Sequence, residues 1–424
     1  MKTEKIYDVI GIGIGPFNLG FAALANDIPE LNCIFFDRNE SFNWHPGMML
    51  PNAKLQVPFY ADLVTLANPT SQFSYLAFLK AKNRLFRFAI NENNFASRIE
   101  YNSYCRWVAD QLTSLQFGME CEVINFNEAD NCYEVYVKSK ELNQRYIFRS
   151  KRIIIGNGTV PYMPDFTKGL KRNYVFHSSE YLFRKDNAIN KKDICVIGSG
   201  QSAAEIFYDL LEQRDLHLNW FTRSARFYPM DYSKLALEMT SPDYVDHFYS
   251  LPDHIKPSIL KGQDQLYKGI NFSLIDEIYG RLYEMSLEER SYMPALCSNC
   301  DLLDMKQTDE RFTLVFKHLE TNAVFEKITD IVILATGYQY KLPEFIEPIK
   351  SIINWTNDEK YKLKRNYCID ENETIFVQNA ELHSHGYNSA DLGFGPYRNA
   401  TILNTILGYE RFGLERNIAF QRFG

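Results

Sequence analysis

The sequence of 424 residues lacks an apolar run as long as a membrane span, and it lacks a cluster of basic residues. Its formal net charge of -7 creates no field that would attract nucleic acid or another polyanion. The N-terminus places Asp8 and glycines where a signal peptide needs an apolar core. We therefore expect a cytoplasmic protein whose partners are small molecules, with neither nucleic acid nor membrane among them.

Cysteine pairs with metal-binding spacing are also scarce. The eight cysteines are scattered, and only Cys297 and Cys300 are separated by just two residues. A zinc site needs a second pair of ligands, and no Cys or His cluster follows within reach. We expect no metal site and interpret the cysteines as reduced thiols. A redox role for the pair of Cys297 and Cys300 is the alternative.

The composition is that of a folded protein with more than one domain. Hydrophobic residues make up 46% of the sequence and aromatic residues 15%, which excludes a disordered chain. The length exceeds that of one typical domain, so two or three domains are expected.

A glycine turn near the N-terminus predicts a nucleotide site. An apolar run at 7–10 precedes it and a helical pattern at 19–24 follows it. The turn residues of interest are Gly11, Gly13, Gly15, Pro16 and Asn18. A strand, a tight glycine turn and a helix let backbone amides approach a pyrophosphate at the positive end of the helix dipole. Proline stands at position 16, where the standard dinucleotide pattern has glycine, so the turn is a GxGxGP variant.

The next expected strand, at 32–37, ends in Asp37. An acid at this distance from the first glycine suits a hydrogen bond to a ribose hydroxyl of a dinucleotide. The alternative is a solvated aspartate at the end of a strand. Beyond it, the irregular segments 44–51 and 54–64 are rich in proline and aromatic residues, and we expect them to fold over a ligand.

A second glycine turn follows the buried strand expected at 193–197. Its residues are Gly198, Ser199, Gly200, Gln201 and Ser202. The strand after it, expected at 216–221, leads into Arg223 and Arg226 and not into an acid. An arginine at that position favours a 2'-phosphate, so NADPH is preferred to NADH. The alternative is that these arginines are surface charges.

Several other elements follow from apolar spacing and from turn residues. The spacing predicts a helix over 101–115 and a closing helix over 396–407. The expected strands lie at 132–137, 144–149, 152–155, 312–316 and 330–334. Residues 232–295 contain no glycine turn and are predicted to be mostly helical, as an insertion that caps the cofactor crevice.

Two nucleotide turns in one chain, one followed by an acid and one by arginine, indicate FAD and NADPH together. The predicted fold class is α/β, with two Rossmann-like dinucleotide-binding domains and a mostly helical substrate-capping insertion. The expected boundaries are 1–168 with 335–424 for the FAD domain, 169–231 with 296–334 for the NADPH domain, and 232–295 for the insertion.

The chain resembles the N-hydroxylating flavin monooxygenases that act on lysine, ornithine or diamines in siderophore biosynthesis. Asp330, Leu334, the segment 335–338 and Pro343 match the D-x3-L-ATGY-x4-P pattern of that family at every fixed position. Other segments are similar in order and spacing: 11–19, 44–48, Asp62-Leu63 with 69–71, 198–203 and His385-Gly386. The resemblance covers nearly the whole chain.

The resemblance implies that NADPH reduces FAD and that a flavin hydroperoxide then hydroxylates a primary amine. It implies cofactor contacts for Trp44, His45, Gln56, Thr336, Gly337 and Tyr338. Gln56 is the candidate for contacting the flavin, and Asn271 resembles the asparagine that touches nicotinamide and substrate. As a lone asparagine, Asn271 would otherwise be a cap or turn residue. The family also implies a homo-oligomer, either a tetramer or a dimer.

The substrate is indicated by a departure from the family. In the amino-acid hydroxylases a lysine that pairs with the substrate carboxylate stands where this chain has Ala61. Leu237 and Gly393 stand near family asparagine and serine positions, although the alignment at Leu237 is less well defined. A substrate carboxylate buried without a cation costs several kcal/mol. An aliphatic diamine is therefore expected, putrescine ahead of cadaverine.

The second ammonium of a diamine needs an acid or a carbonyl. Asp391 and Glu381 are the candidates, with exposed surface charges as the alternative. The aromatic residues Trp44, Phe59 and Tyr60 would shield the reaction from water, or simply pack in the core. Two other functions remain open: L-lysine or L-ornithine N-monooxygenase, and a FAD- and NADPH-dependent reductase without hydroxylation. A nucleotide-binding protein without redox activity is a third.

Overall fold

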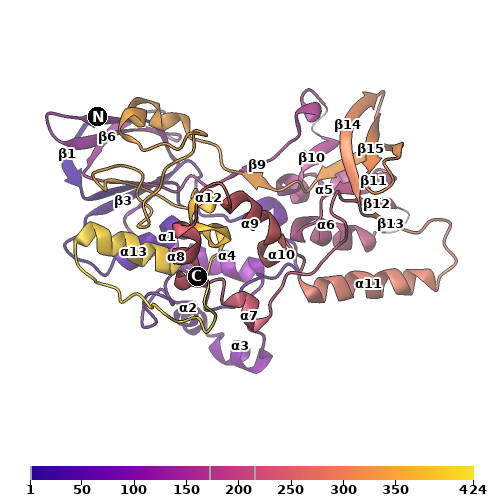
Figure 1. The fold of residues 1–424 in the computed structure, drawn as a ribbon, viewed down its shortest axis with the longest axis horizontal. Coiled ribbons are helices and arrows are strands. Elements are labelled where there is room, and N and C mark those ends of the chain that lie inside the picture. The colour runs from indigo at the N-terminus through magenta and orange to yellow at the C-terminus, as the bar shows by residue number, and fades with distance from the viewer. Residues whose placement is uncertain (1, 171–172, 214–215) are drawn as a thin grey trace.

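The computed structural model describes residues 2–170, 173–213 and 216–424. Two α/β units lie side by side and are joined near β9 (Figure 1). Each unit has a five-stranded parallel sheet with helices on one face and antiparallel strands on the other. This arrangement confirms the predicted α/β fold with two Rossmann-like units.

The sheet of the first unit has the order β19-β8-β2-β3-β4 and is parallel throughout. Its strands are β2 (Val9–Ile12), β3 (Cys33–Asp37), β4 (Leu115–Phe117), β8 (Ile153–Ile155) and β19 (Ile375–Val377). Both faces are buried at β2, β8 and β19, so these strands show no alternation of buried and exposed residues. Ile154 packs with the helices, whereas Ile153 and Ile155 pack with the antiparallel strands.

The faces of this sheet are covered in different ways. The helical face carries α1 (Pro16–Ala25), α4 (Arg98–Ala109) and α13 (Gly395–Leu407). The other face carries a sheet of order β1-β7-β6-β5, built from β1 (Lys2–Tyr7), β5 (Met119–Asn127), β6 (Cys132–Ser139) and β7 (Arg145–Ser150). The strand expected to run unbroken from Tyr7 is thus two strands in two sheets, because Asp8 turns the chain and accepts the amide N–H of Asn32 at 3.0 Å.

The second unit repeats the plan. Its parallel sheet has the order β10-β17-β11-β12-β13, with β10 (Val175–His177), β11 (Asp193–Ile197), β12 (His217–Phe221), β13 (Ala295–Cys297) and β17 (Ile331–Leu334). One face packs against α5 (Tyr181–Ile189), α6 (Gln201–Leu211) and α11 (Phe272–Ser286). The other face packs against the antiparallel strands β14 (Cys300–Thr308), β15 (Arg311–His318) and β16 (Val324–Thr329).

The segment 232–295 is mostly helical, as predicted. It contains α7 (Lys234–Leu237), α8 (Pro242–Ser250), α9 (Lys256–Gly262), α10 (Asp264–Tyr267) and α11. The segment divides between the two units. Phe248 of α8 packs with Tyr387 of the C-terminal region, whereas Ile278 and Met285 of α11 pack in the core of the second unit. The domain boundaries proposed from the sequence stay a prediction.

Short elements complete the fold. They are α2 (Tyr75–Ala81), α3 (Leu85–Asn91), α12 (Leu382–His385), the bridging strands β9 (Val160–Pro161) and β18 (Tyr338–Gln339), and five 3-10 segments η1 (Pro46–Met48), η2 (Asp165–Thr167), η3 (Ser178–Glu180), η4 (Glu344–Ile352) and η5 (Tyr387–Ala390). Across the described ranges, every helix is too short or too polar to cross a lipid bilayer.

The predicted helix over 101–115 is wrong at both ends. The helix begins at Arg98, where the Ser97 side chain accepts the Glu100 amide at 3.1 Å as an N-cap, and it ends at Ala109. Leu115 belongs to β4. Leu112 and Leu115 continue the apolar spacing because they enter the same core, so burial extends the pattern beyond the helix.

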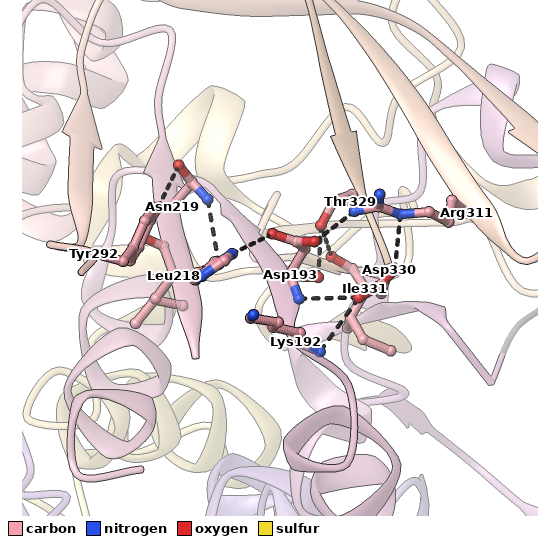
Figure 2. A network of polar contacts seen from close by, with 10 residues as sticks. Lys192, Asp193, Leu218, Asn219, Tyr292, Arg311, Thr329, Asp330 and Ile331 are labelled. Carbon is pink, nitrogen blue, oxygen red and sulfur yellow. Dashed lines mark hydrogen bonds and ion pairs between the residues drawn. The ribbon is translucent and has the colours of Figure 1, made fainter. Parts of the chain in front are cut away.

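Asp330 lies at the amino end of β17, where Figure 2 shows it in a polar network. Its carboxylate accepts the amide of Asp193 at 3.0 Å and pairs with Arg311 of β15 at 2.9 Å. Arg311 also contacts the Asp193 carboxylate at 2.5 Å. The network ties the antiparallel strands to the parallel sheet. Since dinucleotides bind at the carboxyl ends of such strands, this family residue acts at the opposite edge.

We expect Asp330→Ala to destabilise the second unit by about 1–3 kcal/mol, because two amides and Arg311 lose their acceptor. The midpoint of thermal unfolding should fall, while the affinity for NADPH of the protein that remains folded should not change. Glu320→Ala, at an exposed position, is the matched control and should leave the midpoint unchanged. An unchanged midpoint with weakened NADPH binding would contradict the structural role.

Candidate active site

The first glycine turn is shaped for a pyrophosphate. Gly13 has φ of 87°, and a Cβ at that position would lie 2.4 Å from the Gly156 carbonyl oxygen. A Cβ on Gly15 would meet nothing within 4 Å, so open space faces this residue. Gly15 is also the N-cap of α1, and it provides no side-chain cap. The first amides of α1 therefore remain available to an anionic group, as FAD binding requires.

Asn18 and Asp37 support this turn from two sides. The Asn18 side chain donates to the Gly13 carbonyl at 2.7 Å and accepts from Gln378 at the same distance. Asn18 therefore shapes the turn, and Gln378, which sequence reasoning missed, orients it. The Asp37 carboxylate accepts the amide of Ile14 at 2.7 Å. Each carboxylate oxygen accepts more than one hydrogen bond, so Asp37 retains capacity for a ribose hydroxyl.

The second turn has the same plan. Gly198 has φ of 144°, and a Cβ there would lie 2.3 Å from the Ala335 carbonyl oxygen. Gly200 caps α6 without a side-chain hydrogen bond, which leaves the helix amides open to a phosphate. Ser199 and Ser202 are partly exposed beside them. The arrangement fits the pyrophosphate of a second dinucleotide.

Arg223 and Arg226 extend from the end of β12 and are exposed. No hydrogen bond or ion pair to their side chains occurs within the described part of the chain. Thr222 fixes this strand end, since its amide donates to the Cys297 carbonyl at 2.9 Å and its carbonyl accepts from Cys300 at 2.8 Å. Both cysteines are free thiols, and burial raises the pKa of each, which disfavours a reactive thiolate.

The Trp44–Met48 turn joins the two units. A Cβ on Gly47 would lie 1.8 Å from the Ser179 carbonyl oxygen, so only glycine allows this approach. His45 adopts the left-handed region, with φ of 48°. Desolvation by the surrounding protein disfavours the charged ring and lowers the pKa of His45 to about 4, and the charge of Arg98 adds to this effect. The ring is therefore neutral at pH 7. Its ring meets Tyr338 edge-on at 5.8 Å between centroids.

The segment 335–338 crosses between the units at the carboxyl ends of the strands. The Thr336 hydroxyl donates to the Tyr162 carbonyl at 2.5 Å, and the His177 ring contacts the Gly337 carbonyl at 2.9 Å. Tyr338 of β18 then pairs with β9. Tyr338 thus lies against His45, and the cofactor contacts of Thr336, Gly337 and Tyr338 stay a prediction.

A polar chain brings together three predicted residues. The Tyr232 hydroxyl donates to Asn271 Oδ1 at 2.6 Å, and the Asn271 amide donates to Gln201 at 2.8 Å. Gln56 donates to the Gly269 carbonyl at 3.1 Å. Burial raises the pKa of Tyr232 to about 12, against a hydrogen bond with Gln56 that lowers it. Tyr232 therefore stays neutral and holds Asn271 Oδ1, while Gln56 is held by the Gly269 carbonyl two residues before Asn271.

The network of hydrogen bonds continues from Gln201, in the second glycine turn, into α6. Gln201 donates to Glu205 at 3.0 Å, and Glu205 forms a buried ion pair with Arg98 at 2.8 Å. Arg98 also donates to the Met48 carbonyl at 2.6 Å. Sequence reasoning missed Tyr232, Glu205 and Arg98. A cavity of about 90 Å³ lies beside this network, between residues 50–54, α6 and α11.

Three of the predicted substrate residues also meet. A Cβ built on Gly393 would lie 3.1 Å from Asp391 Oδ1 and 3.2 Å from the Cβ of Ala61. Asp391 accepts the Phe394 amide at 3.1 Å. Burial raises the pKa of Asp391, while the amides of Phe394 and Gly393 and the charge of Arg398 lower it. A carboxylate and a methyl group thus both lie close to Gly393, and the substrate role of these three residues stays a prediction.

Other predicted residues fall elsewhere. Glu381 is 1% exposed and forms an ion pair with Arg398, so it is neither a surface charge nor open to a ligand. This overturns both expectations for Glu381, because two buried charges must pair. Leu237 ends α7 and is 41% exposed, with no contact to Ala61 among the interactions described.

The three aromatic residues expected to shield the reaction do not share one environment. The ring of Trp44 packs on Tyr101 at 5.2 Å, and that of Phe59 packs on Phe88 at 5.3 Å, so core packing accounts for both. Tyr60 is 47% exposed.

The comparisons with known proteins agree with this geometry. The family model described as L-lysine 6-monooxygenase/L-ornithine 5-monooxygenase matches residues 5–340. A putrescine N-hydroxylase of Shewanella oneidensis is 47% identical over 99% of this chain and 84% of its own length. The FAD-bound cadaverine monooxygenase DfoA of Erwinia amylovora superimposes with a TM-score of 0.97, at 44% identity and 99% coverage of both chains. An ornithine N-hydroxylase of Kutzneria with FAD, NADP+ and L-ornithine has a TM-score of 0.88 at 26% identity, covering 95% of this chain and 99% of its own.

We expect Arg223→Ala to raise the KM for NADPH about tenfold and to leave the KM for NADH unchanged, because a charge-assisted hydrogen bond to the 2'-phosphate is lost. Steady-state oxidation of NADPH and of NADH gives the ratio of the two KM values. Arg226→Ala in parallel shows which arginine acts, and Arg87→Ala, on the exposed face of α3, is the control. An unchanged NADPH-to-NADH ratio in both variants would leave the two arginines as surface charges.

Proposed function

The chain belongs to the L-lysine 6-monooxygenase/L-ornithine 5-monooxygenase family, and from this membership we propose that it N-hydroxylates one primary amine of an aliphatic diamine. The reaction uses FAD, NADPH and molecular oxygen, as a step of hydroxamate siderophore biosynthesis. Putrescine and cadaverine are the proposed substrates, since the relatives named above act on these two diamines. Bound FAD, reduced by NADPH, supplies the activated oxygen.

The observation that carries the diamine proposal is the contact of Ala61, Gly393 and Asp391. In the amino-acid hydroxylases that the chain resembles, a lysine at position 61 pairs with the substrate carboxylate. Here that position is a methyl group beside an acid. A substrate carboxylate would be buried against Asp391 without a cation, whereas a second ammonium would pair with it.

We propose that Asp391 binds the distal ammonium in its ionised form. Because burial raises its pKa above the ordinary value, diamine binding should weaken as the pH falls through that pKa. The reacting amine, unlike the distal one, must be uncharged. It must be neutral to attack, and with an ordinary pKa of roughly 10.4 only about one amine in a thousand is neutral near pH 7. Desolvation at the flavin favours the neutral amine.

Gln56 and Asn271 are proposed to orient the reacting groups. Asn271 Oδ1 is occupied by Tyr232, so its amide N–H groups are turned toward another acceptor. The Gln56 amide is held by the Gly269 carbonyl in the same way. The proposed cofactor contacts are the two glycine turns, Asp37, Arg223 and the contacts of His45 with the segment 335–338.

Three further properties are proposed, and the last of them rests on the resemblance. They are the domain division at 168, 231, 295 and 334, a cytoplasmic location, and self-association as a dimer or a tetramer. Sedimentation equilibrium of the FAD-loaded protein distinguishes these assemblies from a monomer.

An amine panel tests the function. Wild-type protein should form hydroxylamine from putrescine or cadaverine at least about a hundredfold more efficiently, as kcat/KM, than from L-lysine or L-ornithine, because a substrate carboxylate buried without a cation costs several kcal/mol. Ala61→Lys should lower diamine turnover, because its ammonium occupies Asp391. Ala81→Lys, at an exposed helix end, is the control for an added charge.

The alternatives give different results in that panel. Equal or better turnover of lysine or ornithine would establish an amino-acid hydroxylase in place of the proposed enzyme. NADPH oxidation without any hydroxylamine would establish a reductase, and no NADPH oxidation would leave a nucleotide-binding protein.

Tyr232→Phe should lower the hydroxylamine formed per NADPH oxidised about fivefold, because Asn271 loses the hydroxyl that orients its side chain. The rate of flavin reduction should stay within twofold of wild type. Tyr279→Phe on the exposed face of α11 is the matched control. An unchanged yield of hydroxylamine would show that the network is structural only.

A further inference from the structure

Arg398 of α13 is a charged side chain that the proposed reaction leaves unused. It is 0% exposed, and its Nη1 contacts both Glu381 and the Ser389 carbonyl, the latter at 3.0 Å. Its Nε and Nη2 have no hydrogen-bond partner among the described residues. A buried cation with unused donors is costly, so packing alone gives no reason for it.

The position of Arg398 connects two parts of the site. Its guanidinium carbon lies 4.2 Å from the centroid of the Phe17 ring, in the first glycine turn. Ser389, whose carbonyl it holds, belongs to η5, and Asp391 directly follows this segment as its C-cap. One rigid, planar group therefore contacts both the cofactor turn and the segment that presents Asp391.

The charged and titratable groups near Asp391 include one cation, Arg398. Arg398 of α13 lowers the pKa of Asp391, and Asp391 in turn raises the pKa of Tyr387 in η5. Glu381 faces Arg398 and not Asp391, and Ala61 contributes no charge. Arg398 is the only cation named among the influences on Asp391 in the described part of the chain. It thus opposes the effect of burial, which favours a neutral carboxyl.

We propose that Arg398 is a positioning residue for diamine recognition: by holding the Ser389 carbonyl and packing on Phe17, it fixes the segment that leads to Asp391 relative to the FAD turn. The inference rests on the proposed diamine hydroxylation. A purely structural Arg398 would support all amines equally. A positioning Arg398 supports only substrates with a second ammonium, and this difference can be measured.

The test compares putrescine with 1-aminobutane, which has the same chain length and no distal ammonium. Binding of each amine to FAD-loaded protein is measured by calorimetry, together with turnover. Arg398→Gln should lower the preference for putrescine over 1-aminobutane about tenfold, the value of one charge-assisted hydrogen bond. Arg398→Lys should restore most of it. The acid limb of the putrescine profile should move up by about one pH unit in Arg398→Gln.

A second variant separates positioning from folding. Glu381→Gln combined with Arg398→Met removes both charges, and the glutamine keeps an acceptor for the Ala380 amide. Replacing both members of a buried pair is often neutral for stability. This double variant should lose the putrescine preference as Arg398→Gln does. If Arg398→Gln fails to retain FAD, the double variant tests the positioning role in its place. Arg311→Gln, in the distant network of Figure 2, is the ion-pair control and should keep the preference.

The outcomes are distinct. An unchanged putrescine preference in Arg398→Gln or in the double variant would overturn the positioning role. If wild-type protein binds putrescine in preference to 1-aminobutane and forms no hydroxylamine, the proposed function is wrong. The ratio of the affinities for putrescine and 1-aminobutane in Arg398→Gln then still tests the role of Arg398. A wild-type protein without that preference would overturn both.

Discussion

Backbone meets backbone at three places, and the active site depends on these contacts. Gly13 approaches the Gly156 carbonyl, Gly198 the Ala335 carbonyl, and Gly47 the Ser179 carbonyl, each so closely that a Cβ would overlap the oxygen. Close-packed interiors do not yield to such an overlap, so glycine is required at all three. The first two contacts shape the nucleotide turns and the third joins the units. The crevice between the cofactors is therefore set by main-chain geometry.

Substrate choice in this crevice depends on a few charges. Replacing a cation by Ala61 removes a site for a carboxylate, but the loss alone would leave a nonspecific apolar pocket. In the proposed site Asp391, close to Ala61, would bind a cation, and the charge of Arg398 opposes the effect of burial on that carboxyl. Arg398 itself is fully buried and needs Glu381 as its partner, so the ion pair and the segment before Asp391 are held together.

Residues that match a family pattern need not act on the substrate. Asp330 stands in the most specific pattern of the chain, yet it ties β17 to β11 and β15 at the edge away from the cofactors. His385 is also buried, and it contacts Ser384 and the Arg365 carbonyl. Burial holds the pKa of His385 well below its ordinary value, so it carries no charge at pH 7. Both residues hold the scaffold that the cofactor residues need.

The sequence by itself determined the local units: two strand-turn-helix motifs, an acid after one and arginines after the other, and the family pattern at 330–343. These depend on residues close together in the chain, where backbone preference and apolar spacing decide the structure. Only the tertiary structure showed that Gly393 lies close to both Ala61 and Asp391, that the Tyr232 hydroxyl holds Asn271, and that Arg398 forms an ion pair with Glu381. These contacts join distant segments, and packing, which no local pattern encodes, brings them together.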